Sequence, residues 1–262
     1  ASTRQQIQLL LDHLHDYSRS QKLPIAIHKI SRHDFEESHL LKQNEYIPIH
    51  SPPMAYMDIT WSSLSDYKKD SLRVSKNVRR KLNWEINKNK KEGIRIIALE
   101  DLSGYEDRLY SLIAFNFEKY NSKRLSLDKS IFYMLNEILL HKIRVYAAFK
   151  NNNMIGMSLF LVNGDIWYSY LVGIDHEQVG SDLTYFNITF YQPINDAINL
   201  KIKKIYYGNN LYDAKIRRGC QIMEMDTYYK VWNPFYKRIM QEYAHVHRIW
   251  HLHKFPSNIR DA

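Results

Sequence analysis

Three apolar segments follow one another in the middle of the chain with almost no room between them. They read "IRVYAAFK", "MIGMSLFLV" and "IWYSYLVGI", at residues 143–150, 154–162 and 166–174. The connecting sequences "NNN" and "NGD" are typical of the tight turns that join neighbouring antiparallel strands. The chain is therefore expected to contain a sheet that is antiparallel at its centre.

The segments around this meander alternate between strand and helix patterns. Apolar spacing predicts a strand "IRIIAL" and two helices before the meander, then a helix, a strand "KKIYYG", a short helical segment and a last strand "QIMEMDTYYKV" after it. The predicted helices cover residues 104–120, 127–141 and 183–200.

The first 64 residues show a smaller pattern of the same kind. We expect a helix over 4–18, a strand "PIAIHKI", a short helix over 33–43 and a second strand near 55–60. The two adjacent prolines in "EYIPIHSPPMAYMDI" are expected to break the run before that second strand. The predicted organisation is a partial αβ unit over 1–64, a basic connecting helix over 65–92, a main domain over 93–232 and a helical tail over 233–262.

Composition narrows the class of protein. A chain of 262 residues with 45% hydrophobic residues can bury a substantial core. Its single cysteine, Cys220, excludes an intramolecular disulfide and favours a reducing cytoplasmic setting. No apolar run approaches the roughly 18 residues of a membrane span. The formal net charge of +9 favours partners that carry phosphate: RNA, coenzyme A or anionic lipid.

Much of this charge lies in "SLRVSKNVRRKLNWEINKNKKEG", residues 71–93. Leu72, Val78, Leu82 and Ile86 form a thin apolar stripe, and Gly93 is typical of a helix end. The basic residues either form only a solvated helix face or bind the phosphates of a nucleic acid, for which Lys76, Arg80 and Lys91 are the best placed at helical spacing. The nucleic-acid candidates are Lys76, Arg79, Arg80 and Lys91.

Other polar groups allow a structural and a functional interpretation. "HVHRIWHLH" carries four histidines, but no cysteine or carboxylate accompanies them, so a surface helix is favoured over a metal site. Cys220 is expected to be a small buried residue. Tyr168 and Tyr170 either line a cleft or pack a half-buried sheet.

The order of elements over residues 93–230 resembles the GCN5-related N-acetyltransferase (GNAT) fold. That resemblance implies a mixed α/β fold of the α+β type, with a mainly antiparallel sheet flanked by helices and, here, a truncated N-terminal αβ unit. It also implies that "IWYSYLVGID" separates from the next strand to expose backbone groups for an acyl donor. The donor would contact Val172, Gly173 and Ile174 and the following loop at Gly180 and Ser181. Because this loop has one glycine, it departs from the glycine-rich turn of acetyl-coenzyme A enzymes.

Two motifs resemble the Fem-like branch of these acyltransferases: "LSDYKKDSLRVSKNVRRKLNWEINKNKKEGIRI" and "YYGNNLYDAKIRRGC". The branch includes aminoacyl-tRNA-dependent transferases that act on peptidoglycan precursors or small peptides. The resemblance implies that an amine attacks an ester or thioester carbonyl, with proton removal by Asp175, His176 or Glu177, or by a water that one of them holds. Lys215 would stabilise an oxyanion or the leaving group, with Tyr212 as a second proton donor. Candidate substrate-binding residues are Asn116, Tyr120, Arg124, Tyr168, Tyr170, Tyr207, Asn209 and Arg218.

The sequence therefore predicts an N-acyltransferase that delivers an aminoacyl or acyl group to an amine of a small molecule or peptide. Aminoacyl-tRNA is favoured over acyl-coenzyme A as the co-substrate, and no tightly bound cofactor or metal is expected. A coenzyme A-dependent enzyme of the same fold and a non-catalytic RNA-binding module remain alternatives. A role on a lipid surface is less favoured, because the basic helix lacks a broad apolar face.

Overall fold

The computed structural model describes residues 3–32, 34–121, 125–179 and 183–254. These residues fold into two compact units. The first unit is discontinuous and combines Ala1–Met54 with Ile222–Ala262, whereas the second is the continuous segment Ala55–Gln221. Among the described residues, no helix is both long and apolar enough to cross a membrane.

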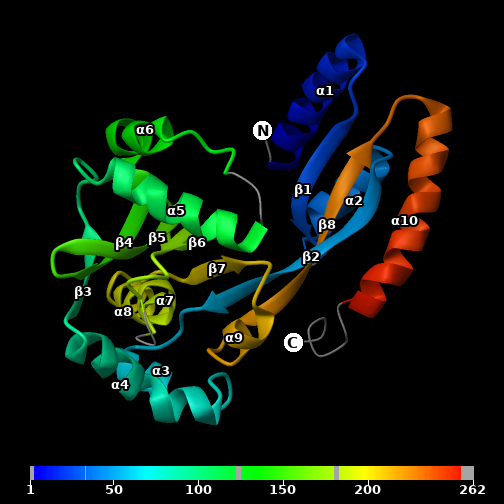
Figure 1. The fold of residues 1–262 in the computed structure, drawn as a ribbon. Coiled ribbons are helices and arrows are strands. Elements are labelled where there is room, and N and C mark those ends of the chain that lie inside the picture. The colour runs from blue at the N-terminus through cyan, green and yellow to red at the C-terminus, as the bar shows by residue number, and fades with distance from the viewer. Residues whose placement is uncertain (1–2, 33, 122–124, 180–182, 255–262) are drawn as a thin grey trace. The chain divides into compact units, whose positions relative to one another are not determined.

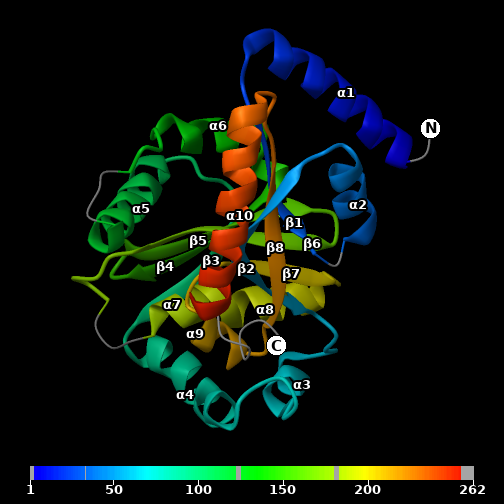
Figure 2. The same cartoon turned by 90° about the vertical axis from the view of Figure 1, so that its right-hand side faces the viewer.

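The first unit is built on three strands in the order β1-β8-β2. Only the residues of β2 up to Met54 belong to this unit. β1 (Ile25–Ser31) and β8 (Gln221–Lys230) are antiparallel. Helix α10 (Pro234–Lys254) runs alongside β8, as both ribbon views show (Figures 1 and 2). The helices α1 (Thr3–Gln21) and α2 (Phe35–Gln43) complete the unit. Its core contains Leu11, Ile25, Leu40, Leu41, Tyr46 and Tyr228.

Strand β2 (Ile47–Asp58) corrects the expectation that the proline pair breaks the chain. Pro52 and Pro53 lie inside the continuous strand. The segment that pairs with β7 begins two residues after Pro53, at Ala55. Proline is compatible with extended backbone and lacks only the N–H donor, so it is tolerated where few ladder hydrogen bonds depend on it.

The second unit has the strand order β2-β7-β6-β5-β4-β3 and a mostly antiparallel sheet. The predicted meander is present, and it extends to a fourth antiparallel strand, β3. Helices lie on both sides of these strands, with α5 and α6 opposite α7 and α8 (Figure 1). The strands are β3 (Ile94–Leu99), β4 (Ile143–Lys150), β5 (Asn153–Asn163), β6 (Ile166–Ile174) and β7 (Lys204–Gly208).

The helices of this unit cover the sheet at defined points. α5 (Glu106–Asn121) packs on β5 and β6 and is followed by α6 (Ser130–Ile138) and a 3₁₀ turn, Leu140–Lys142. The core includes Leu109, Leu112, Phe132, Val145, Met157 and Leu159. The remaining helices are α3 (Leu64–Lys69), α4 (Lys76–Lys91), α7 (Thr184–Phe186), α8 (Gln192–Asn199) and α9 (Tyr212–Ile216).

The single helix predicted over 183–200 is instead three pieces, with a π-helical turn, Asn187–Tyr191, between α7 and α8. Pro193 lies in the first turn of α8 and cannot donate to the carbonyl four residues earlier. The hydroxyl of Ser158 donates to the carbonyl of Ile188 at 2.6 Å. A missing donor and a competing side-chain donor are both causes of a local change in helical pitch.

Helix α4 is amphipathic, but its inner face differs from the predicted stripe. Val78 and Leu82 are buried as expected, whereas Leu72 precedes the helix and is 96% exposed. Glu85 and Asn89 extend the buried face. The helix begins where the Ser75 hydroxyl accepts a hydrogen bond from the Val78 amide at 3.4 Å. Most of its basic residues therefore lie on the outer surface.

Candidate functional site

The parallel strands β6 and β7 separate after a short paired stretch. Their pairing consists of Ile166 with Lys204, Trp167 with Ile205 and Tyr168 with Tyr206, while β6 remains paired with β5 as far as Ile174. An unpaired strand edge presents N–H and C=O groups that an extended ligand can bind. The opening between β6 and β7 is the place where the GNAT resemblance puts an acyl donor.

Lys215 lies beside the β7 side of this opening. Its ammonium donates to the carbonyl of Tyr207 at 2.5 Å and to Asn210 Oδ1 at 3.3 Å. The register between β2 and β7 skips Tyr207, because Ala55 pairs with Gly208 and Tyr56 with Tyr206. The bulge thus turns a strand carbonyl toward the lysine instead of toward the ladder.

Burial shifts the pKa values of the ionisable side chains around Lys215. Lys215 is 2% exposed, and the loss of solvation lowers its pKa to about 8. Lys215 is therefore still mostly charged at neutral pH. Burial also raises the pKa of Cys220, which agrees with the expectation of a buried thiol. Tyr212 is partly buried, which raises its pKa, and Asn209 is exposed at the end of β7.

Arg218, expected to bind substrate, instead joins several elements of the second unit. Its side chain is almost fully buried, lies 3.4 Å above the Phe186 ring and has Nη2 3.5 Å from Glu85 Oε2. Its carbonyl accepts a hydrogen bond of 3.1 Å from Tyr67. Glu85 also accepts a hydrogen bond from Tyr191. Arg218 therefore connects α4 to the segment before β8.

Asn116 and His176 meet at the other end of β6. Asn116 Nδ2 donates to the Val172 carbonyl at 3.2 Å, which leaves Oδ1 facing His176 Nε2 at 3.0 Å. Because Oδ1 can only accept, Nε2 carries the proton and Nδ1 is the basic nitrogen. Burial, followed by the nearby Lys119 charge, lowers the pKa of His176, so its imidazole is neutral at neutral pH. Tyr120 contacts the same ring edge-on at 5.8 Å.

Asp175 is held by a different set of contacts. Arg108 donates to it at 2.7 Å, and the backbone amides of Glu177 and Gln178 donate to its other oxygen. Although burial acts to raise the pKa of Asp175, the hydrogen bond and charge of Arg108 and those amides lower it. Asp175 therefore organises the turn after β6 and is a weak base.

The backbone at Gly173 is covered by helix α5. A Cβ atom at this position would lie 2.6 Å from the Leu112 carbonyl carbon and 2.8 Å from the Ile113 nitrogen. Only glycine permits this approach. Ile174 is buried at the end of the strand. The remaining candidates of this region, Gly180, Ser181 and Arg124, lie outside the described residues.

The two predicted tyrosines of β6 have different surroundings. Tyr168 stacks on Tyr206 of β7, with ring centroids 5.1 Å apart and planes 10° apart. Tyr170 is 62% exposed and lies beyond the last paired residue. Tyr207 is buried and stacks on Phe190 at 4.6 Å. Tyr170 is therefore the more accessible of these rings.

The outer face of α4 combines positive charge with an aromatic ring. Lys76, Arg80 and Lys91 are exposed, whereas Arg79 is half-buried and donates to the Val74 carbonyl at 3.0 Å. Trp84 is 54% exposed, and Lys88 lies 5.1 Å from its ring centroid. Sequence reasoning missed Trp84, although its position four residues after Arg80 and four before Lys88 places all three on one face.

The predicted histidine-rich tail is helix α10, and its histidines lie in unlike environments. His245 is exposed, whereas His251 is 1% exposed and lies 5.2 Å from His50 by ring centroids. Burial, followed by the His50 charge, lowers the pKa of His251 to about 4. The expectation of a surface helix is wrong for His251. Within the described ranges, no group of three or more metal-binding side chains occurs.

Comparison with known structures supports the predicted fold. L-PGS from Bacillus licheniformis superposes with a TM-score of 0.64 at 10% identity, over 89% of this chain and 77% of that one. FemX gives 0.65 at 10% identity, over 92% and 80%. The C-terminal domain of a putative lysylphosphatidylglycerol synthetase from Agrobacterium fabrum gives 0.60 at 11% identity, over 82% and 70%. At such low identity these likenesses concern the fold.

The curated proteins include no match to the chain. A family model, FemAB_like, described as peptidoglycan biosynthesis/recognition, matches residues 1–255. The match covers both structural units and confirms the Fem-like resemblance predicted from the two motifs. The protein belongs to the FemAB-like family and has its mixed, GNAT-like fold.

Proposed function

We propose that this protein is an aminoacyltransferase that moves an aminoacyl group from aminoacyl-tRNA to the amine of a peptide or small molecule. The observation that carries the proposal is the opening between β6 and β7, with the Lys215 ammonium beside its β7 side and His176 just after the end of β6. Membership of a family described by peptidoglycan biosynthesis/recognition supports a peptide-like acceptor.

The proposed reaction needs alignment, proton removal and charge stabilisation. The acceptor amine attacks the ester carbonyl, forming an amide C–N bond and breaking the C–O bond to the tRNA ribose. His176 Nδ1 takes the proton from the attacking nitrogen, directly or through one water, and the imidazolium then returns this proton to the leaving ribose oxygen. The Lys215 ammonium stabilises the negative charge that develops on oxygen. Asn116 acts as a positioning residue, because it fixes the imidazole tautomer.

The outer face of α4 supports tRNA over coenzyme A as the donor. Lys76, Arg80 and Lys91 provide several exposed charges for successive phosphates, and Trp84 offers an aromatic surface to an unpaired base. A protein that only binds RNA would use the same face. Only a measurement of the transfer reaction therefore distinguishes an aminoacyltransferase from a non-catalytic RNA-binding module.

The test incubates the full chain with total tRNA charged with radiolabelled amino acids and with a panel of amines and peptides. A parallel arm replaces the charged tRNA with acetyl-coenzyme A and longer acyl-coenzyme A esters. The proposal expects labelled amide product only in the tRNA arm. Product only in the coenzyme A arm would mean that the donor is an acyl-coenzyme A. Tight tRNA binding without product from any acceptor would favour a non-catalytic RNA-binding module.

A further inference from the structure

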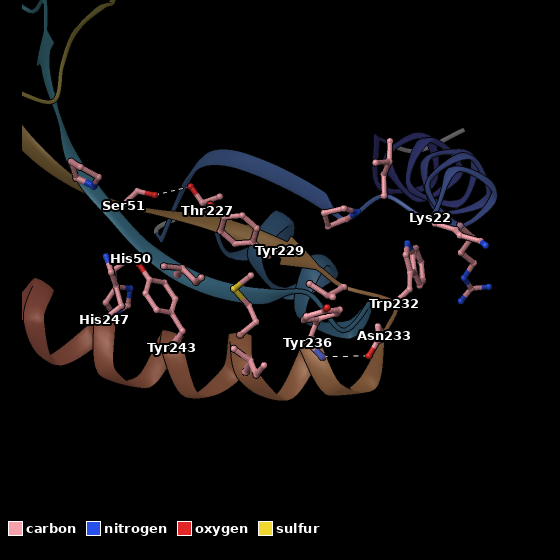
Figure 3. Close-up of a pocket in the computed structure, with 18 residues that line it drawn as sticks. Lys22, His50, Ser51, Thr227, Tyr229, Trp232, Asn233, Tyr236, Tyr243 and His247 are labelled. Carbon is pink, nitrogen blue, oxygen red and sulfur yellow. Dashed lines mark hydrogen bonds between the residues drawn. The ribbon is translucent and has the colours of Figure 1, made fainter. Parts of the chain in front are cut away.

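The first unit contains a large groove that the proposed reaction does not use. It has a volume of about 1100 Å³ and is lined by residues of this unit alone. Figure 3 shows Tyr236, Tyr243 and His247 projecting from α10 toward Tyr229 and His50 on the strands. We call this cavity the α10 groove; its apolar lining includes Pro24, Ile49, Tyr229, Val231, Ile239 and Met240.

The groove is built into the unit, because α10 is anchored at both ends. At its start, Asn233 Oδ1 accepts from the Phe235 amide at 2.9 Å, and the Trp232 indole donates to Ser18 at 2.8 Å. Near its end, His251 is buried beside His50. Between these anchors the helix does not close on the strands. Ile239 and Tyr243 remain 50% and 53% exposed although they face the groove.

The two lysine and arginine side chains that line the groove lie at one end of it. Arg19 and Lys22 lie at the Trp232 end, and the Arg19 guanidinium is 4.3 Å from the Trp232 ring centroid. None of the 18 described residues that line the groove is Asp or Glu. The positive end of the α10 dipole lies at the same end, because the helix begins at Pro234. The opposite end offers neutral polar groups, including the Ser51 and Thr227 hydroxyls, 2.7 Å apart.

The groove is elongated along α10. The lining positions on α10 run from Tyr236 to His247, which corresponds to about 17 Å of helix. An extended apolar chain can follow this length, and a negatively charged head group matches the positive charges of Arg19 and Lys22.

From these features we infer that the α10 groove binds an anionic lipid, with an acyl chain along α10 and the head group at Arg19 and Lys22. The chain would cover the exposed apolar faces of Tyr236, Ile239 and Tyr243, which otherwise contact water. Binding does not require the proposed transferase reaction, so either idea can fail without the other.

The test measures binding of sodium palmitate, below its micelle concentration, to the full chain by isothermal titration calorimetry. Hexadecyltrimethylammonium serves as the probe with the same chain length and opposite charge. Palmitate is expected to bind at least tenfold more tightly. The double variant Arg19→Gln/Lys22→Gln should reduce palmitate affinity at least fivefold, whereas Arg238→Gln, on the exposed surface of α10, should not.

Two further substitutions separate the groove from the rest of the helix. Ile239→Glu places a charge in the groove and should abolish palmitate binding, while Val246→Glu, at a 63% exposed position that does not line it, should leave binding unchanged. The inference would be overturned if palmitate did not bind or if the two probes bound equally well. It would also be overturned if Ile239→Glu and Val246→Glu lost palmitate binding to the same extent. A dimer in sedimentation that Ile239→Glu dissociates would overturn it as well, because a second copy would then fill the groove.

Discussion

The Lys215 ammonium donates a hydrogen bond of 2.5 Å to the carbonyl of Tyr207, the residue that the β2–β7 register leaves out. A strand bulge and a lysine eight residues later along the chain thus produce a buried positive charge at the point where β6 and β7 part. This arrangement leads to the first two predictions, both of which concern the proposed reaction.

Replacing Lys215 by methionine should lower turnover at least about tenfold, because it removes the charge that stabilises the oxyanion while preserving most of the side-chain volume. The measurement is aminoacyl transfer under single-turnover conditions, with circular dichroism to verify the fold. Lys230→Met is the matched control: Lys230 is also buried and donates to a backbone carbonyl, that of Asn44, but in the first unit. Equal turnover in wild type and Lys215→Met would remove Lys215 from the site.

The rate should depend on pH through two groups. His176 must be neutral to accept a proton and its pKa is lowered from 6.5, so activity should fall only as the pH drops below 6.5. Lys215 must be charged, so activity should also fall as the pH rises through about 8. A profile of kcat/KM against pH tests both limits. The upper limit should disappear from the residual activity of Lys215→Met.

Asn116→Asp should move the acid limit of this profile to higher pH, because a carboxylate beside the ring favours the protonated imidazole. Asn116→Ala should lower kcat without that shift, since it releases the tautomer but adds no charge. If Asp175 were the base instead, its lowered pKa would put the acid limit below the usual value of 3.8, and neither Asn116 variant would move it.

Neutralising Lys76, Arg80 and Lys91 together to glutamine should weaken tRNA binding and reduce the slope of log K against log salt. Each lost phosphate contact should change the slope by about 0.7–0.9. The control neutralises three exposed lysines on other elements: Lys42, Lys142 and Lys201. Trp84→Ala should weaken binding without changing the slope, since stacking releases no counterions. An unchanged slope in the first variant would make α4 a solvated face.

Gly173→Ala should destabilise the second unit by about 1–3 kcal/mol, since the new methyl group meets the backbone of α5. Gly156→Ala is the comparison on the neighbouring strand. Its Cβ would meet the ends of flexible side chains, Ile174 Cδ1 at 3.0 Å and Ile188 Cδ1 at 3.3 Å, so its cost should be smaller. Urea unfolding of both variants measures the difference. Equal stability of Gly173→Ala and wild type would mean that α5 can move away from β6.

The sequence predicted the meander well because its signals are local. Residues 143–150 and 166–174 are short apolar runs next to the turn sequences "NNN" and "NGD", and β4 and β6 have these bounds. The proline pair misled the prediction of β2, because the effect of a missing N–H depends on which neighbour strand pairs at that point. The π-helical turn likewise depends on Ser158, about 30 residues away in sequence.

The candidate site shows the same limit. Position after a predicted strand was enough to nominate Asp175 and His176, but not to distinguish them. Arg108, which forms an ion pair with Asp175, and Asn116, which orients His176, both lie on helix α5, at least 60 residues earlier in the chain. Arg218 was nominated from its motif, whereas its buried partner Glu85 lies on α4. Such contacts are tertiary, and a linear pattern does not contain them.

The discontinuity of the first unit determines the order in which the chain can fold. Ile25 pairs with Lys230, about 200 residues later, so β1 cannot acquire its partner until nearly all of the sequence between them has been synthesised. The second unit, Ala55–Gln221, is complete earlier and has its own core. On the ribosome, the second unit can therefore fold while β1 and the α10 groove still wait for the segment that begins at Ile222.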